Sequence, residues 1–239
     1  MSLLVRTWNL YHGRTYPKSG HTYLERMVRL ISLDAPDAVC LQEVPIWALG
    51  RLERWSGMQP VWAITVPNFL GPVARVVTNL DPVRVRFAAA GQANAVLLNP
   101  HFEVTDHDVF VMNPEVSPWD VMFGGRQRRV CQVLRVDLDG RSLVVANLHA
   151  TNNPEVAKAE VGLAADFVNQ EPRVVLCGDF NVPHYAVHEF SPPIKGIDQI
   201  LVRGLEFVRP PGPWPEERRR IGVLLLSDHA PVEAELAWT

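Results

Sequence analysis

The chain has 239 residues, which is long for an average domain but within the size of one large domain built from two packed sheets, so we expect residues 1–239 to form a single domain. Apolar residues make up 47% of the chain, enough for a sizeable core. The formal net charge of −3 excludes an overall basic field that would attract nucleic acid or anionic lipid, although local basic clusters are compatible with it.

The three cysteines, Cys40, Cys131 and Cys177, each lie in an apolar, strand-like run. An odd number of cysteines in such runs favours buried, free thiols in a reducing compartment. No run approaches the ~18 consecutive apolar residues of a membrane-spanning helix, and the N-terminal sequence MSLLVRTWN lacks the apolar stretch of a signal peptide. We therefore expect a cytoplasmic protein that does not insert into membranes.

In the first half of the chain, short apolar runs rich in β-branched residues alternate with helical patterns. The expected strands are residues 3–8, 37–42, 94–99 and 130–138. Between the first two, apolar residues from Leu24 to Ile31 recur at the spacing of one helix face. Residues 44–55 predict a second helix, with Pro45 tolerated in its first turn.

In the second half, Asn153 and Pro154 form a good N-cap and first helical residue. The residues of that helix expected to point inward are Val156, Leu163, Phe167 and Val168. The expected strands are residues 142–148, 173–178, 198–202, 223–227 and 232–238, and the proline-rich stretch 209–220 predicts a surface loop. This order of elements predicts an α/β sandwich in which two sheets pack together and helices cover the outside.

Polar side chains follow several of the buried-looking strands at the point where each strand ends. They are Asn9, Glu43, His149, Asp179, Asn181, Asp228 and His229, and Asp198 begins a further strand. Side chains at strand ends are held rigidly and can converge on one crevice. Each of these residues alone has a simple structural explanation, such as an Asx-turn at Asp179. A separate explanation for every one of them accounts poorly for the repeated pattern.

Oxygen atoms dominate this set of polar side chains. Hard oxygen ligands suit Mg²⁺ or Mn²⁺ rather than zinc, and the chain has no Cys-x-x-Cys, no His-Glu-x-x-His and no histidines at zinc spacing. Mg²⁺ typically takes one or two carboxylates, and water and substrate phosphate complete its shell. The remaining Asp and His residues would then serve proton transfer and phosphate contact, a combination that fits attack of water on phosphorus.

Six short motifs, in order along the chain, resemble those of the endonuclease/exonuclease/phosphatase family, the deoxyribonuclease-I-like superfamily. They are TWN at 7–9, LQE at 41–43, NLHAT at 147–151, GDFN at 178–181, IDQIL at 197–201 and SDHAPV at 227–232. One such motif would be a weak signal, but six in order over nearly the whole chain are specific. The resemblance implies a four-layer α/β/β/α sandwich of two packed mixed β-sheets flanked by helices, and a metal-dependent phosphoesterase.

The resemblance also implies roles for individual residues. The positions that match the family's metal ligands are Asn9, Glu43 and Asp228. Asp179 matches the residue that orients or deprotonates the attacking water, and Asn181 its neighbour that holds phosphate and water. His229 matches the histidine that contacts phosphate, and Asp198 the carboxylate that orients it. His149 matches a second histidine on the phosphate side.

Three further residues are candidates for substrate binding. His12 and Arg14 follow the first metal candidate in NLYHGRT, where a solvated loop is an equally good interpretation. Asn94 lies in GQANAVLLN, which resembles a strand of the family. The arginine-rich runs GGRQRR at 124–129 and ERRR at 217–220 are interpreted as solvated faces.

These features predict a Mg²⁺-dependent phosphoesterase, expected to be a monomer, whose substrate is a phosphodiester in DNA or RNA. One alternative is a phosphatase or phosphodiesterase acting on a lipid, an inositol or another small phosphoester. Another is a non-enzymatic binding module with the same fold, which the presence of all the principal site residues disfavours. A dinuclear metallophosphatase is disfavoured because the chain lacks an early Asp-x-His and a Gly-Asn-His motif.

Overall fold

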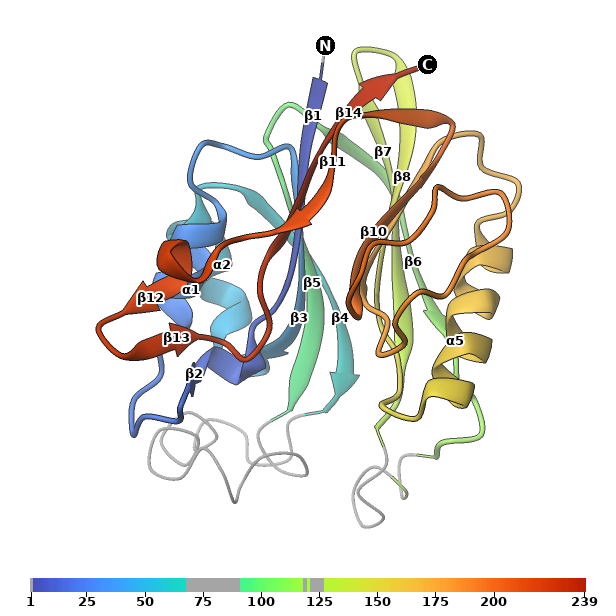
Figure 1. The fold of residues 1–239 in the computed structure, drawn as a ribbon. Coiled ribbons are helices and arrows are strands. Elements are labelled where there is room, and N and C mark those ends of the chain that lie inside the picture. The colour runs from blue at the N-terminus through green and yellow to red at the C-terminus, as the bar shows by residue number, and fades with distance from the viewer. Residues whose placement is uncertain (1, 68–90, 118–119, 121–126) are drawn as a thin grey trace.

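The computed structural model describes residues 2–67, 91–117, 120 and 127–239, and two β-sheets dominate it (Figure 1). The six-stranded sheet has the order β11 (Leu205–Pro213), β14 (Val232–Trp238), β1 (Ser2–Asn9), β3 (Ala38–Pro45), β5 (Gln92–Leu98), β4 (Gln59–Val66). The five-stranded sheet has the order β10 (Asp198–Arg203), β9 (Val174–Asp179), β8 (Arg141–His149), β7 (Val130–Leu138), β6 (Glu103–Val111). Both sheets are mixed, since β1–β3 and β8–β9 pair in parallel and the other neighbours pair antiparallel.

Smaller elements cover the outer faces of the two sheets (Figure 1). The helices are α1 (Leu24–Ile31), α2 (Leu52–Ser56) and α5 (Pro154–Phe167), and 3₁₀ turns occupy Tyr11–Gly13, Ile46–Arg51 and Glu216–Arg219. A small sheet joins β12 (Arg220–Ile221), β13 (Leu224–Leu226) and β2 (Thr15–Tyr16). In the described ranges, no helix combines the length and apolar character that crossing a bilayer requires.

Three apolar clusters hold these layers together. The largest lies between the two sheets and includes Val5, Cys40, Val145 and Val175. A second packs α1 and α2 against the six-stranded sheet, and a third packs α5 against the five-stranded sheet. The predicted four-layer α/β/β/α sandwich is therefore confirmed, and the three cysteines are free and buried, as predicted.

The helix α5 begins as predicted, because the Asn153 side chain accepts hydrogen bonds from the backbone N–H groups of Glu155 and Val156. The prediction of its inward face was right for Val168, which is buried just after the helix, and wrong for Val156, Leu163 and Phe167, which are exposed. The residues that face the sheet are instead Ala157, Glu160, Val161, Ala164 and Ala165. Three of these five residues are alanines, which place little bulk between the helix and the sheet.

Three other expectations differ from the structure. Pro45 ends strand β3 rather than opening a helix, and a 3₁₀ turn precedes the short α2. The proline-rich stretch 209–220 is a loop only in part, because β11 extends to Pro213 as a bulged edge strand, where proline costs no ladder bond, and a 3₁₀ turn occupies Glu216–Arg219. Of residues 223–227, only Leu224–Leu226 form a strand, and it belongs to the small sheet.

A buried polar network joins the two sheets beneath the ends of their central strands. The Gln42 side-chain N–H donates to Asn147 Oδ1 at 2.8 Å and to Thr7 Oγ1 at 3.0 Å. The Asn147 side-chain N–H donates to the backbone oxygens of Leu41 and Ala95, each at 3.1 Å. These bonds set the end of β8 in register with the ends of β1 and β3.

Candidate active site

The end of strand β9 places Asp179 at the centre of the polar strand ends. In the register of the five-stranded sheet, Asp179 lies opposite His149 at the end of β8 and opposite Asp198 at the start of β10. Gly178, just before it, has φ +136°, and a Cβ there would lie 1.9 Å from the Leu148 oxygen. Only glycine permits this close approach of β9 to β8, so it determines where the next carboxylate lies.

Asp179 is 1% exposed and is held by neighbours on both sides. Asn9 donates from Nδ2 to its Oδ2 at 3.0 Å, and the Asn181 backbone N–H donates to its Oδ1 at 3.1 Å. His149 Nε2 and His229 Nε2 lie 3.5 Å and 3.8 Å from its Oδ2. Burial, reinforced by the charge of Asp198, raises the pKa of Asp179 to about 7. A carboxylate with this pKa suits a general base near neutral pH.

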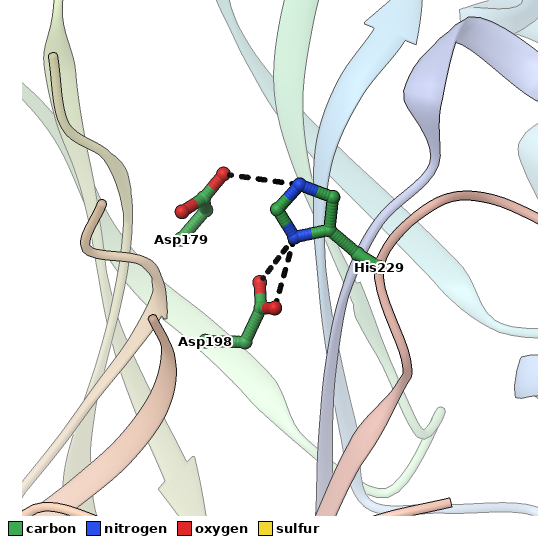
Figure 2. A group of neighbouring side chains, drawn as sticks. All are labelled: Asp179, Asp198 and His229. Carbon is green, nitrogen blue, oxygen red and sulfur yellow. Dashed lines mark hydrogen bonds and ion pairs between the residues drawn. The ribbon is translucent and has the colours of Figure 1, made fainter. Parts of the chain in front are cut away.

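His229 lies in the turn between β13 and β14 and reaches across to Asp198 at the start of β10 (Figure 2). Its Nδ1 lies 2.9 Å and 3.1 Å from the two carboxylate oxygens of Asp198. Burial alone would lower the pKa of His229, but the hydrogen bond and charge of Asp198 outweigh it and, with the charges of Asp179 and Asp228, raise the pKa to about 10. The ring is therefore an imidazolium whose Nε2 points toward Asp179 (Figure 2).

His149 has the opposite electrostatic environment, although it is only 3.5 Å from the same carboxylate. Burial, reinforced by the charge of Arg129, holds the pKa of His149 well below its ordinary value. One neutral and one protonated histidine thus flank Asp179. Environments that push the pKa values of neighbouring groups apart are typical of acid–base sites.

The turn that carries Asp228 and His229 is tied to the rest of the site by its backbone. Ser227 has φ +62°, and its hydroxyl donates to the Asn9 backbone oxygen at 2.7 Å. Trp8 donates from Nε1 to the His229 oxygen at 2.9 Å. Arg219, predicted to be on a solvated face, is 7% exposed and donates to the backbone oxygens of Leu226 and Ser227. Sequence reasoning missed this supporting residue.

The three metal candidates lie on adjacent segments of the six-stranded sheet and its connections. Asn9 pairs with Gln42 across β1 and β3, next to Glu43. Glu43 sits at a bulge of β3 with φ +54°, and its Oε2 lies 2.9 Å from His12 Nε2. Burial would raise the pKa of Glu43, but the charge and hydrogen bond of His12 hold it well below its usual range. Asp228 is exposed and adjoins Ser227.

The donor chemistry of this set fits a hard divalent cation, because it offers an amide oxygen and two carboxylates. A different group of described residues comes closer together. The ligand atoms of Asp179, Asp198 and His229 all lie within 4.8 Å of one another. These three could also hold a metal ion. The pairing of His229 with Asp198 and its raised pKa instead favour a hydrogen-bond donor, which has no lone pair for a metal.

The weaker candidates are all buried, which excludes a solvated loop for His12 and Arg14. His12 is 7% exposed and contacts Glu43, whereas Arg14 is 4% exposed and lies over the Tyr11 ring. Asn94 is 1% exposed and donates to the Val130 oxygen at 3.3 Å, so it links β5 to β7.

A cavity of about 340 Å³ adjoins the His229–Asp198 pair. Its walls include the apolar side chains of Ile194, Ile197 and Val232, and Lys195 lies at its margin. A second, more polar cavity of about 360 Å³ includes Arg129, Thr151 and Asn152. Arg129 was predicted to be solvated but is 8% exposed. Of the other two arginines of that run, Arg128 is exposed, as predicted, and Arg126 lies outside the described residues.

Solved structures with the same fold span the whole chain. An endonuclease/exonuclease/phosphatase from Beutenbergia cavernae DSM 12333 has a TM-score of 0.73 at 20% identity, covering 99% of this chain and 72% of that one. A mannosyl-6-phosphatase from Bacteroides thetaiotaomicron VPI-5482 has a TM-score of 0.67 at 16% identity, covering 99% and 100%. Humanized D. rerio TDP2 has a TM-score of 0.63 at 13% identity, covering 99% of each chain.

Identities this low show a shared fold, so the family rests on sequence. A search among curated proteins finds no match. The family model described as the Endonuclease/Exonuclease/phosphatase family matches residues 7–229, which include every motif from TWN to the histidine of SDH. The chain therefore belongs to the endonuclease/exonuclease/phosphatase family.

Proposed function

We propose that this protein is a Mg²⁺-dependent phosphoesterase that cleaves a phosphodiester in nucleic acid. The observation that carries the proposal is the environment of Asp179. It is a buried carboxylate with a pKa near 7, held by Asn9 and Asn181 and flanked by a neutral and a protonated histidine. This arrangement suits the removal of a proton from water beside a negatively charged phosphoryl group.

Each residue then has a distinct task. Asp179 orients the attacking water and accepts its proton, while Asn181 holds the water and a phosphoryl oxygen. His229 donates a hydrogen bond from Nε2 to the phosphoryl group, where negative charge grows in the transition state. Asp198 acts through His229, since it orients the ring and keeps it charged. His149 is neutral and contacts the phosphoryl group from the other side of Asp179.

The residues proposed to hold the cation are Asn9, Glu43 and Asp228. When bound, Mg²⁺ or Mn²⁺ would neutralise negative charge on the phosphoryl group. Glu43 contributes a carboxylate that stays ionised, because His12 beside it holds its pKa low.

A second candidate substrate is a small phosphomonoester. The observation that favours it is the 340 Å³ cavity beside His229, which matches a small organic group better than a strand of nucleic acid. Its apolar walls and the exposed Lys195 fit a mixed apolar and anionic ligand.

Hydrolysis of a panel of substrates tests both candidates. The panel comprises single- and double-stranded DNA, RNA, bis(p-nitrophenyl) phosphate, p-nitrophenyl phosphate, an inositol phosphate and a phospholipid. We expect cleavage of the nucleic acids and the model diester with Mg²⁺ or Mn²⁺, and a loss of ~10²-fold or more in Asp179→Asn, which keeps the shape of the side chain.

Other results would contradict the proposal in different ways. Full activity in excess EDTA would exclude the role of a metal. Cleavage restricted to the monoesters would support the second candidate. Binding of nucleic acid without hydrolysis of any substrate would indicate a non-enzymatic module.

A further inference from the structure

A buried glutamate on helix α5 holds the loop that follows strand β8. Glu160 lies on the inward face of α5 and is 2% exposed. Its Oε2 accepts from the backbone N–H of Thr151 at 2.6 Å, and its Oε1 accepts from the Thr151 hydroxyl at 2.8 Å. Glutamate is rarely found at a fully buried position unless it is paired, and here both of its oxygens are bound to one residue, two positions after His149.

The peptide group between Ala150 and Thr151 is bound at both of its polar ends. Its N–H, which belongs to Thr151, donates to Glu160, and its carbonyl oxygen, which belongs to Ala150, accepts from Asn181 Nδ2 at 2.8 Å. The N–H and C=O of a trans peptide lie in one rigid plane and point in opposite directions. Glu160 therefore fixes the plane of this peptide, and the plane fixes the direction from which the Asn181 amide donates. Hydrogen bonds in such a chain also polarise and strengthen one another.

The same segment joins Asn181 to the proposed general base. The Ala150 N–H donates to the Asp179 backbone oxygen at 2.9 Å, and the Asn181 N–H donates to Asp179 Oδ1 at 3.1 Å. Among the described residues, no donor contacts Oδ1 of Asn181. Because Nδ2 is held by Ala150, that oxygen is available to a water molecule beside Asp179.

We propose that Glu160 is a positioning residue that orients the Asn181 side chain through the peptide between Ala150 and Thr151. The proposal deepens the proposed function and rests on it. Glu160 keeps Asn181 Nδ2 on Ala150, and so keeps Oδ1 directed at the water that Asp179 deprotonates. Glu160 itself contacts no reacting atom. A small displacement of a group that orients the attacking water lowers turnover, because it changes the geometry of attack.

Three variants of Glu160 and one control test this role. Glu160→Met has a similar length but removes both acceptors. Glu160→Gln keeps an acceptor for the Thr151 N–H, and its amide can donate to the Thr151 hydroxyl, which is able to accept. Glu160→Asp keeps the carboxylate but shortens the side chain by one methylene. Glu155→Gln is the matched control, because Glu155 is an exposed carboxylate of the same helix that pairs with Lys158.

Two measurements report on the variants. The first is kcat and KM on bis(p-nitrophenyl) phosphate with Mg²⁺. The second, made by NMR without substrate or metal, is the rate at which the side-chain amide protons of Asn181 exchange with water. The side-chain amide of Asn147, which donates to the backbone oxygens of Leu41 and Ala95, is the reference within the same protein.

We expect Glu160→Met to lower kcat by ~10-fold to ~10²-fold while KM stays within about twofold of the wild type. Amide exchange should become faster at Asn181 and stay unchanged at Asn147. Glu160→Gln should recover most of both losses, and Glu155→Gln should stay within about twofold of the wild type, as expected for an exposed ion pair.

A double-mutant cycle separates this role from general support of the fold. If Glu160 acts through Asn181, Glu160→Met should change kcat by less than about twofold in a protein that already carries Asn181→Ala. An equal fall in kcat with and without the Asn181 side chain would overturn the proposal. Wild-type kcat in Glu160→Met, or equally faster exchange at Asn181 and Asn147, would overturn it too.

Two further comparisons keep the test decisive. If Glu160→Met does not fold, Glu160→Asp decides, since wild-type kcat and wild-type exchange at Asn181 in that variant would exclude the proposed role. If the wild-type protein hydrolyses no substrate, the proposed function fails, whereas amide exchange at Asn181 still tests whether Glu160 orients this side chain.

Discussion

Replacing Asp198 by asparagine should lower the pKa of the His229 ring while the ring keeps its position. The rise in the pKa of His229 from 6.5 to about 10 corresponds to roughly 5 kcal/mol of preference for the charged ring. Asp198 is the main source of that preference, through its hydrogen bond and its charge. Asparagine keeps an oxygen near Nδ1 but removes the charge, so the pKa of His229 should fall most of the way back to 6.5.

The assay is an NMR titration of the His229 ring in the metal-free protein, with kcat measured on one responsive substrate. We expect a large fall in the pKa of His229 and a kcat that is ~10-fold to ~100-fold lower, the scale for a partner that orients a functional group. His229→Ala, which removes the ring itself, should lose ~10²-fold or more with little change in KM.

The pH dependence of the unfolding free energy tests the pairing of His229 with Asp198 independently. The folded-state pKa of His229 is raised, so its pairing with Asp198 stabilises the fold fully below pH 6.5, and this contribution is lost as the pH rises through about 10. The unfolding free energy of the wild type should therefore exceed that of Asp198→Asn most near pH 6 and least near pH 10. A titration of His229 that is unchanged in Asp198→Asn would refute this reasoning.

Three further predictions follow from the site and its supports. Glu43→Gln should raise the Mg²⁺ concentration needed for half-maximal activity while the unfolding midpoint stays within a few degrees; an unchanged requirement would exclude Glu43 as a ligand. Asn147→Ala removes bonds to Gln42 and two backbone oxygens, so denaturant titration should show a loss of ~3 kcal/mol, at about 1 kcal/mol per bond. Gly178→Ala would place a Cβ 1.9 Å from the Leu148 oxygen, so it should lower both stability and kcat; wild-type values would show that β9 can shift freely.

The motif residues of the site could be found in the sequence because the end of an apolar strand can be recognised from a few neighbouring residues. Apolar runs that stop at Asp179 or His149 are visible without any knowledge of the partners of these residues. The strands with weak apolar character were not predicted, among them β4 and β6. Both are edge strands whose outward residues face solvent, so their alternation is diluted by polar side chains.

The environment of each site residue depends on neighbours that are distant in sequence. The pKa values of Asp179 and His229 arise from burial and from Asp198, which only the packing of two sheets brings near. The same run of arginines holds an exposed Arg128 and a buried Arg129, and no local pattern separates them. The sequence by itself determined the family, most of the strands with strong apolar character and the donor chemistry, whereas tertiary structure decided protonation and burial, because desolvation and Coulomb interactions depend on distance in space.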